Sequence, residues 1–304
     1  MTRTNKTTLL GFFVFTFIGI VLCSAACARE PGSAYNYPAG ASIGTSLGLN
    51  PPTGFYVSNI FNYYGASVSA ANSQLAAPSV NLTSASDIPK LIWSTPYTIL
   101  GATEMVYIAE PIVDLTVTKS TGTNRQTGLA NPAIAPINLS WSLGDGFHVA
   151  GIFVFYPPTG QYDVTHKANI GNNFWTVQPE FAASYLKDGF DITLHAFSNI
   201  NTENPTTHYT SGDQVFFDFT AAKWWGKVEA GAVAYYNNQV TNDVDNGTTF
   251  PNKNLTRPQQ FALGGIVGYD FGPVKLQGWL TQDVSARDGG NSGTRFWTRL
   301  VAAF

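Results

Sequence analysis

Apolar and polar side chains alternate along most of the chain, most clearly in residues 293–304. In that stretch Phe296 and Leu300 fall on one face, while Arg295 and Arg299 fall on the other. A period of two is the repeat of a β-strand. One face suits lipid and the other suits a polar lumen, so the pattern predicts a membrane strand. The alternative is the last strand of a soluble sandwich, which would need buried partners for both arginines.

Similar runs of about ten residues lie between turn signals and predict about twelve strands. In residues 174–186, for example, Val177 and Phe181 face one way while Gln178 and Glu180 face the other. A Lys or Arg facing lipid at the bilayer midplane would cost about 2 to 4 kcal/mol, so the polar face is assigned to the lumen. The predicted strands are 54–64, 90–100, 104–117, 130–141, 147–156, 174–186, 190–199, 214–223, 227–237, 260–271, 274–284 and 295–304.

Short and long connections alternate between these strands. The short ones each contain the glycine that tight hairpins favour: 101–103, 144–146, 187–189, 224–226 and 272–273. The long ones are 65–89, 118–128, 157–173, 201–213, 238–259 and 285–294. This sorting predicts an all-β fold, a transmembrane antiparallel β-barrel with short periplasmic turns, long extracellular loops and both termini in the periplasm.

The first 28 residues have the pattern of a secretory signal peptide. Arg3 and Lys6 precede an apolar run over 9–22, and small residues end at Ala28. An uncleaved anchor, or a lipoprotein lipidated at Cys27, is the alternative. Residues 29–53 are rich in Gly, Pro, Ala and Ser, and predict an irregular periplasmic arm, a lumen plug or a disordered tail. Residues 54–304 form the predicted barrel.

Charge and cysteine content narrow the class further. Charged residues make up 12% of the chain, about half of what soluble domains usually carry. Removal of Arg3 and Lys6 with the signal would change the net charge from −3 to −5, which disfavours nucleic acid as a partner. Both cysteines lie within the first 28 residues, so the mature chain would hold no disulfide and no cysteine metal site.

Charged and aromatic side chains on the predicted inner faces are the candidate lining of a solute path. The charges can form ion pairs across the lumen that hold the barrel together, or they can form a polar constriction. The aromatic rings would narrow the lumen. The candidates are Glu110, Asp114, Glu180, Phe197, Asp218, Glu229, Lys275, Trp279, Asp283, Arg295, Trp297 and Arg299.

An outer-membrane lipid-modifying enzyme is the alternative from another class. No histidine lies in a motif that would provide a nucleophile or a metal with its partners. Asp163 and His166, with His208 from the next loop, could meet at the extracellular rim as a metal or acid/base site, or could be ordinary solvated polar residues. No catalytic residue, cofactor or metal ligand is assigned.

Several short motifs, in a fixed order, resemble one family. The chain is similar over nearly its whole mature length to the outer-membrane transporter-like family named for the meta-pathway of phenol degradation, which also includes proteins similar to sphingosine-uptake outer-membrane proteins. The motifs are Pro38-Ala39-Gly40, Pro51-Pro52-Thr53-Gly54-Phe55-Tyr56, Pro157-Pro158-Thr159-Gly160-Gln161-Tyr162-Asp163, Ala168-Asn169-Ile170-Gly171-Asn172-Asn173-Phe174-Trp175, Tyr209-Thr210-Ser211-Gly212 and Arg295-Phe296-Trp297.

The resemblance implies a monomeric barrel in the bacterial outer membrane that passively admits small hydrophobic or aromatic compounds. The terminal Phe304 resembles the signature that the barrel assembly machinery reads, so that machinery and outer-membrane lipids are expected partners. A general porin or a purely structural barrel remains the alternative to a selective channel.

Overall fold

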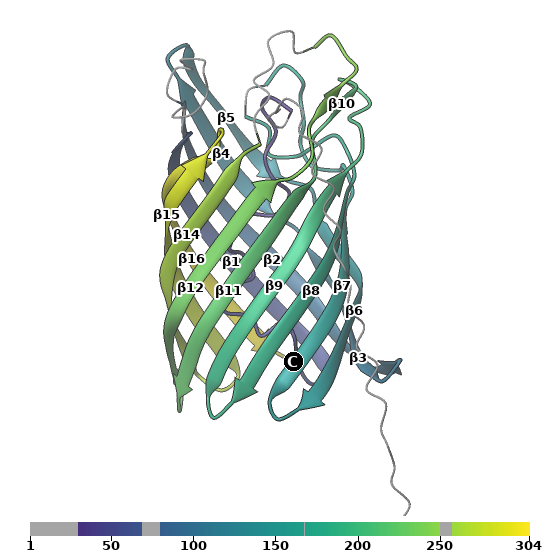
Figure 1. Cartoon of the computed structure of the whole chain (residues 1–304), viewed down its shortest axis with the longest axis vertical. Helices are drawn as coiled ribbons and strands as arrows, with labels where there is room; N and C mark the ends of the chain where they lie inside the picture. Colours follow the sequence, from purple (N-terminus) through teal and green to yellow (C-terminus); the bar gives the residue numbers. More distant parts are fainter. Residues whose placement is uncertain (1–29, 69–79, 167, 250–256) are drawn as a thin grey trace, which may run out of the picture.

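The computed structural model describes residues 30–68, 80–166, 168–249 and 257–304. The predicted signal peptide therefore lies outside the described residues. The described chain forms one tall antiparallel barrel, with long connections at its upper end and short turns at its lower end (Figure 1). The C-terminus lies at the end with the short turns, as the alternating loop lengths predicted.

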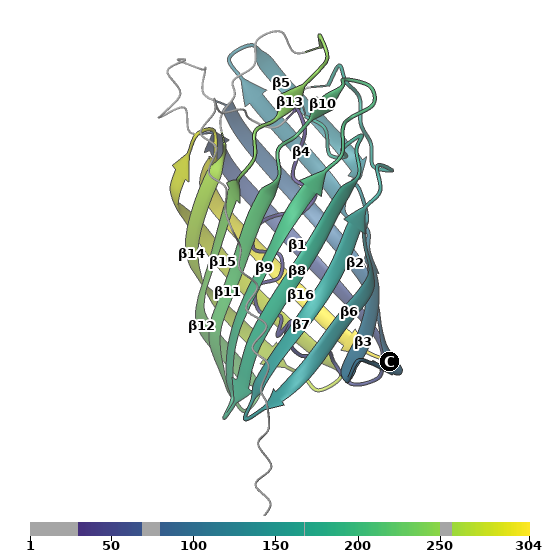
Figure 2. The same ribbon diagram turned by 45° about the vertical axis from the view of Figure 1, so that its right-hand side comes forward.

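Sixteen strands are assigned in the described residues. Fourteen form the main sheet, and β10 and β13 form a small ladder of their own among the upper loops (Figure 2). The strands are β1 (Gly54–Val68), β2 (Val80–Ile99), β3 (Ala102–Ala109), β4 (Ile112–Lys119), β5 (Gly122–Leu129), β6 (Ala133–Gly144), β7 (Phe147–Tyr156), β8 (Thr176–Lys187), β9 (Phe190–Asn201), β10 (Tyr209–Thr210), β11 (Gln214–Trp225), β12 (Val228–Gln239), β13 (Val244–Asp245), β14 (Gln259–Asp270), β15 (Val274–Arg287) and β16 (Asn291–Ala303).

The barrel wall has twelve strand positions and closes on itself. β1 pairs with β2 on one side and with β16 on the other, so the first and last strands meet. β2 pairs with β3 along one part of its length and with β4 along the next, while β6 pairs with β3 and β5 with β4. Thus β3 and β4 together occupy one wall position, and β5 and β6 occupy the neighbouring one. The prediction of a closed twelve-stranded barrel is confirmed.

Two neighbouring wall strands are interrupted, which the sequence analysis did not predict. The single strand expected over 104–117 is two strands, separated at Glu110 and Pro111. The long loop expected over 118–128 was also wrong, because β4 and β5 pair there as a hairpin that rises toward the extracellular end. Pro111 and Pro132 flank the interruption, and proline has no N–H to donate to a sheet ladder.

The first extracellular connection is also shorter than predicted. β1 continues to Val68 and β2 begins at Val80, and these two strands pair along their whole upper length. The predicted loop over 65–89 is therefore mostly strand. Polar residues such as Asn81 and Ser84 concealed the alternation there.

The short turns carry the backbone geometry that tight hairpins need. Asp145 and Gly146 both have positive φ, as do Asp188 and Gly189. A type I′ turn requires this at both central positions, and it matches the twist of the flanking strands. No helix in the described part of the chain has the length and hydropathy to cross a membrane.

The two faces of each wall strand differ as the alternation predicted. On β8, Gln178, Glu180 and Ser184 are buried in the lumen, whereas Phe181 is half exposed on the outside. Large apolar side chains are exposed on strands around the whole barrel. This outer surface suits lipid, and the buried polar residues show that the lumen is largely filled.

Candidate solute path through the barrel

Residues 30–53, here called the inner segment, lie inside the barrel and run along it (purple in Figure 2). At the extracellular end, Glu30 contacts the long loops. At the other end, Asn50 donates to the carbonyl oxygens of Thr103 and Asn138, beside the short turns. The inner segment therefore spans the lumen from one end to the other before it enters β1.

The upper end of the inner segment is held by a buried carboxylate. Glu30 accepts hydrogen bonds from the Tyr162 hydroxyl at 2.6 Å, from Asn204 Nδ2 at 2.9 Å and from Thr207 Oγ1 at 3.1 Å. Burial, with the carboxylate beside it, raises the pKa of Tyr162, which keeps the phenol protonated as a donor. These bonds join the inner segment to two different extracellular loops.

Asp218 on β11 is the centre of the contacts lower down. Its carboxylate accepts the Tyr37 hydroxyl at 2.6 Å, the Gly40 N–H at 3.1 Å, and both the N–H and the hydroxyl of Ser42, at 3.2 and 2.7 Å. Hydrogen bonds to a buried charged group are stronger than neutral ones. Asp218 thus fixes a tight turn of the inner segment against the wall.

The arginines of β16 hold the opposite side of the same turn. Arg299 donates to the carbonyl oxygens of Ala41 at 2.6 Å and Ile43 at 2.7 Å, and Arg295 donates to that of Ala39 at 3.2 Å. Ion pairs between these arginines and lumen carboxylates were one of the two possibilities that the sequence left open. Among the described residues no carboxylate lies within ion-pair distance of either one, because the inner segment fills the space between and its carbonyl groups take the donors.

Glu229 and Gln277 complete the lower contacts. Gln277 Nε2 donates to the carbonyl of Gly44 at 2.8 Å and to Glu229 at 2.7 Å. Gly44 has a positive φ of 74°, and a Cβ built there would lie 2.5 Å from the Ile266 side chain. Only glycine fits this position of the inner segment without displacing the wall.

Aromatic rings occupy the lumen around these polar groups. The rings of Phe197 and Phe216 stack with their centroids 4.8 Å apart, and the Tyr37 ring packs edge-on against Phe197 with a centroid distance of 4.5 Å. Trp279 and Trp297 stack at 5.4 Å on the neighbouring wall. All five are buried, so the lumen is narrow where the inner segment passes them.

A row of hydrogen bonds links three wall strands to the inner segment. Glu180 lies 2.9 Å from His195 Nε2, and His195 Nδ1 lies 2.9 Å from the Ser42 hydroxyl. The acid, histidine and serine follow one another as in a hydrolase triad. However, the Ser42 hydroxyl donates to Asp218, and the Glu180 and His195 side chains are only 3% exposed. This row of hydrogen bonds therefore joins β8, β9 and β11 to the inner segment.

A cavity of about 600 Å³ lies beside the upper part of the inner segment, residues 30–39, toward the extracellular side. Aliphatic side chains of β2 and β4 form one wall, among them Leu82, Val113 and Leu115. Arg295 and Tyr64 lie at its deeper end, next to Ala39 of the inner segment. This is the space that a solute arriving from outside would enter first.

Three further residues predicted to line the lumen lie in three different places. Asp283 accepts hydrogen bonds from the Tyr64 and Tyr235 hydroxyls at 2.6 and 2.5 Å, inside the barrel. Glu110 lies half-buried at the interruption between β3 and β4, and Lys275 is exposed at the lower rim, over the Trp224 ring.

Asp114 does not join the lumen residues. It forms a two-bond ion pair with Arg125 across the β4–β5 hairpin, on the opposite face of β4 from Val113 and Leu115. The hydrogen bond from Arg125 lowers the pKa of Asp114. The register of β3 and β4 against β2 is the same on both sides of the break, so even-numbered residues such as Ile108 and Ile112 face outward on both strands, and Asp114 faces outward with them. The expected position was wrong because the hairpin holds this carboxylate on the outer face, paired with Arg125.

Several residues central to these contacts were missed by sequence analysis. Tyr64, His195, Tyr235 and Gln277 all lie on inner faces. Alternation alone could have found His195 and Gln277, which lie two residues from the predicted Phe197 and Trp279. Tyr37 could not be found in this way, because the inner segment has no regular period.

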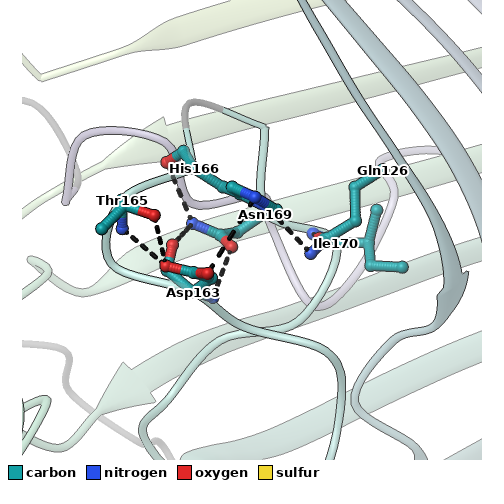
Figure 3. Close-up of polar contacts among 6 residues, drawn as sticks. All are labelled: Gln126, Asp163, Thr165, His166, Asn169 and Ile170. Carbon is teal, nitrogen blue, oxygen red and sulfur yellow. Dashed lines mark hydrogen bonds and ion pairs between the residues drawn. The ribbon is translucent and has the colours of Figure 1, made fainter.

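The candidate site in the extracellular loops is not assembled. Asp163 caps its own turn by accepting from the Thr165 N–H and hydroxyl, and its backbone exchanges hydrogen bonds with Asn169 (Figure 3). The Thr165 hydroxyl contributes most to the lowered pKa of Asp163. His166 Nε2 lies 3.9 Å from Asp163.

His208 is bonded elsewhere, to Glu203 at 2.9 Å. Of the two possibilities left open by the sequence, a shared site of His208 with Asp163 and His166 is therefore not formed. Over 30–68, 80–166, 168–249 and 257–304, no group of three His, Asp or Glu side chains is placed to hold a metal. The loop is instead tied to the hairpin, because the Ile170 N–H donates to Gln126 on β5 (Figure 3).

The closed barrel, its apolar outer surface and its filled polar lumen define a bacterial outer-membrane β-barrel protein. Residues 65–300 match the family described as "Putative MetA-pathway of phenol degradation", and the chain belongs to that family. No curated protein matches the chain in sequence.

Solved structures share the fold. An outer-membrane channel from Pseudomonas putida F1 is similar with a TM-score of 0.73 and 15% identity, over 84% of this chain and 97% of that one. The translocator domain of the autotransporter NalP from Neisseria meningitidis is similar with a TM-score of 0.54 and 9% identity, over 86% of this chain and 92% of that one. At these identities the likeness concerns the fold.

Proposed function

We propose that the protein is a channel for passive uptake of small hydrophobic or aromatic compounds across the outer membrane. The observation that carries this proposal is the extracellular cavity, whose aliphatic wall leads down to a lumen lined with aromatic rings. Small-molecule sites are usually concave and mostly apolar, with a few placed polar groups. The family description, which refers to phenol degradation, supports this class of solute.

In this proposal the inner segment is a plug that closes the lumen at rest. It is held by hydrogen bonds to Asp218, Arg295 and Arg299, which water can replace when the segment shifts. Phe197, Trp279 and Trp297 would line the path, together with Glu180, Glu229 and Asp283. The chain works as a monomer, without cofactor or catalysis, among outer-membrane lipids and after insertion by the barrel assembly machinery.

Uptake measurements test the proposal. A deletion strain is grown on a panel of phenols, alkylated aromatics and long-chain amines, and accumulation of each is measured with and without the restored gene. We expect reduced uptake of a subset of the hydrophobic solutes. Unchanged uptake of all of them, with lipid hydrolysis by the purified protein, would replace the channel with an enzyme. A large, steady and unselective conductance would indicate a general porin.

A further inference from the structure

We propose that the extracellular cavity selects amphipathic acids, and that Arg295 binds the carboxylate of the ligand while the aliphatic wall holds its hydrophobic body. This inference rests on the proposed function, because it names the solute class that the uptake path takes. It assigns Arg295 as the residue that determines specificity at the floor of the cavity.

The apolar half of the site is continuous along two paired strands. Leu82 faces Val117 in the ladder between β2 and β4, and Val113 and Leu115 continue the same face toward Ile88. All five line the cavity. A volume of about 600 Å³ accommodates a ligand of about a dozen heavy atoms, since drug-sized pockets occupy roughly 300 to 1,000 Å³.

The polar half is a guanidinium that is buried and incompletely bonded. Arg295 is 6% exposed; its Nη1 donates a long hydrogen bond of 3.2 Å to the carbonyl of Ala39, and Tyr64 is its other hydrogen-bonding neighbour. Its Nε has no hydrogen-bond partner. The Tyr64 ring lies 3.8 Å from its Cζ and stacks against one face of the group. A buried donor without an acceptor costs free energy until an acceptor arrives.

The neighbouring carboxylates do not neutralise this arginine directly. Within the described chain, none lies within ion-pair distance of Arg295. Asp283 is bonded to the hydroxyls of Tyr64 and Tyr235 and to the Gly293 N–H. Glu30, the only acid lining the cavity among the described residues, is bonded to Tyr162, Asn204 and Thr207. Asp283 acts on Arg295 only at longer range, through space, while its own oxygens are occupied by these donors. The guanidinium of Arg295 is therefore the charged group at the floor, opposite the aliphatic wall.

The chemistry of the two halves determines the ligand. A carboxylate can accept two parallel N–H bonds from one guanidinium, which a neutral amide or alcohol cannot reproduce. A carboxylate bound there also competes with the Ala39 carbonyl for Arg295. Binding an acid thus removes one contact between the inner segment and β16, and couples occupancy of the cavity to loosening of the inner segment.

The test uses two probes of the same shape, 4-tert-butylbenzoate and 4-tert-butylbenzamide, binding to the full chain in lipid nanodiscs, with empty nanodiscs subtracted. We expect the acid to bind at least about tenfold more tightly than the amide. Arg295→Gln should abolish that preference, and its affinity for the amide should stay within about twofold of that of the unsubstituted protein. Lys119→Gln, which removes another cation that lines the cavity, is the matched control and should retain the preference.

Equal binding of both probes, binding of neither, or an acid preference that persists in Arg295→Gln would overturn the inference. Heat-modifiable migration on gels checks that each variant is folded. If Arg295→Gln does not fold, Arg295→Lys serves instead. Lysine keeps the charge but loses the bidentate geometry, so the ratio of acid affinity to amide affinity should fall severalfold. Uptake of neutral 4-tert-butyltoluene into proteoliposomes is measured in parallel: its failure alone overturns the proposed channel, while acid preference alone decides this inference.

Discussion

The Tyr37 hydroxyl donates to the Asp218 carboxylate over 2.6 Å in the middle of the barrel, and both side chains are buried. This bond joins a segment without regular structure to a wall strand 181 residues further along the chain. It belongs to a set of four donors that converge on one carboxylate. The inner segment is therefore positioned by the wall rather than by its own secondary structure.

Removal of that carboxylate should loosen the inner segment. Asp218→Ala leaves the Tyr37 hydroxyl and the Gly40 N–H without their acceptor, and each bond to a charged group is worth about 1.5 to 3 kcal/mol. We expect higher single-channel conductance in planar bilayers with the barrel still folded. Asp114→Ala removes an equal charge from the extracellular hairpin and should leave conductance unchanged. Equal conductance in both variants would show that Asp218 does not hold the segment.

Deletion of residues 30–50, with the signal retained, tests the inner segment as a whole. The wall strands pair with one another independently of it, so we expect a folded, heat-modifiable barrel. Because the lumen would then contain water in place of the segment, conductance and leak of small antibiotics should rise severalfold. A folded barrel with unchanged leak would mean that wall side chains and loops close the lumen by themselves.

Gly48 tests how closely the inner segment approaches the wall. A Cβ at this position would lie 2.7 Å from the His148 carbonyl oxygen and 2.7 Å from the Ser184 N, which are backbone atoms and cannot rotate away. Gly48→Ala should displace the lower part of the segment and increase its cleavage by protease in the folded protein. At Gly65 on β1 a Cβ meets nothing within 4 Å, so Gly65→Ala is the matched control. Equal cleavage of the two variants would contradict this prediction.

The Asp114–Arg125 pair gives the extracellular hairpin a dependence on pH. Since Arg125 lowers the pKa of Asp114 in the folded state, the stabilisation is present above the unfolded-state value of about 3.9 and is lost as the pH falls through the lower, folded value. We expect β4 and β5 to be better protected from amide exchange in the native protein than in Asp114→Asn, and this difference in protection should be the same at every pH between 5 and 8. The difference between the two proteins should begin to shrink below about pH 4 and disappear once the pH is below the lowered, folded-state pKa of Asp114. A difference that changes near neutral pH would point to another group.

The sequence by itself determined most of the wall strands, the inward faces of those strands and the end of the barrel at which the short turns lie, but not the division of 104–117 into two strands or the hairpin over 112–129. These features follow from short-range rules: side chains alternate with a period of two, and turns such as Asp145-Gly146 and Asp188-Gly189 need residues that tolerate positive φ. The inward positions of Phe197, Trp279 and Arg299 could therefore be counted along single strands.

Only the tertiary structure decided the path of residues 30–53 and the partners of the lumen charges. A segment without a repeat carries no period from which its contacts can be counted, and its polar backbone can satisfy any wall donor it reaches. An ion pair of Arg299 with a carboxylate across the lumen was one possibility from the sequence, but Arg299 instead donates to the carbonyls of Ala41 and Ile43. Asp114 likewise lies on the outer face, where its partner is Arg125 of the neighbouring strand. Contacts between residues more than a hundred positions apart depend on how the closed barrel fills its lumen, which no local pattern encodes.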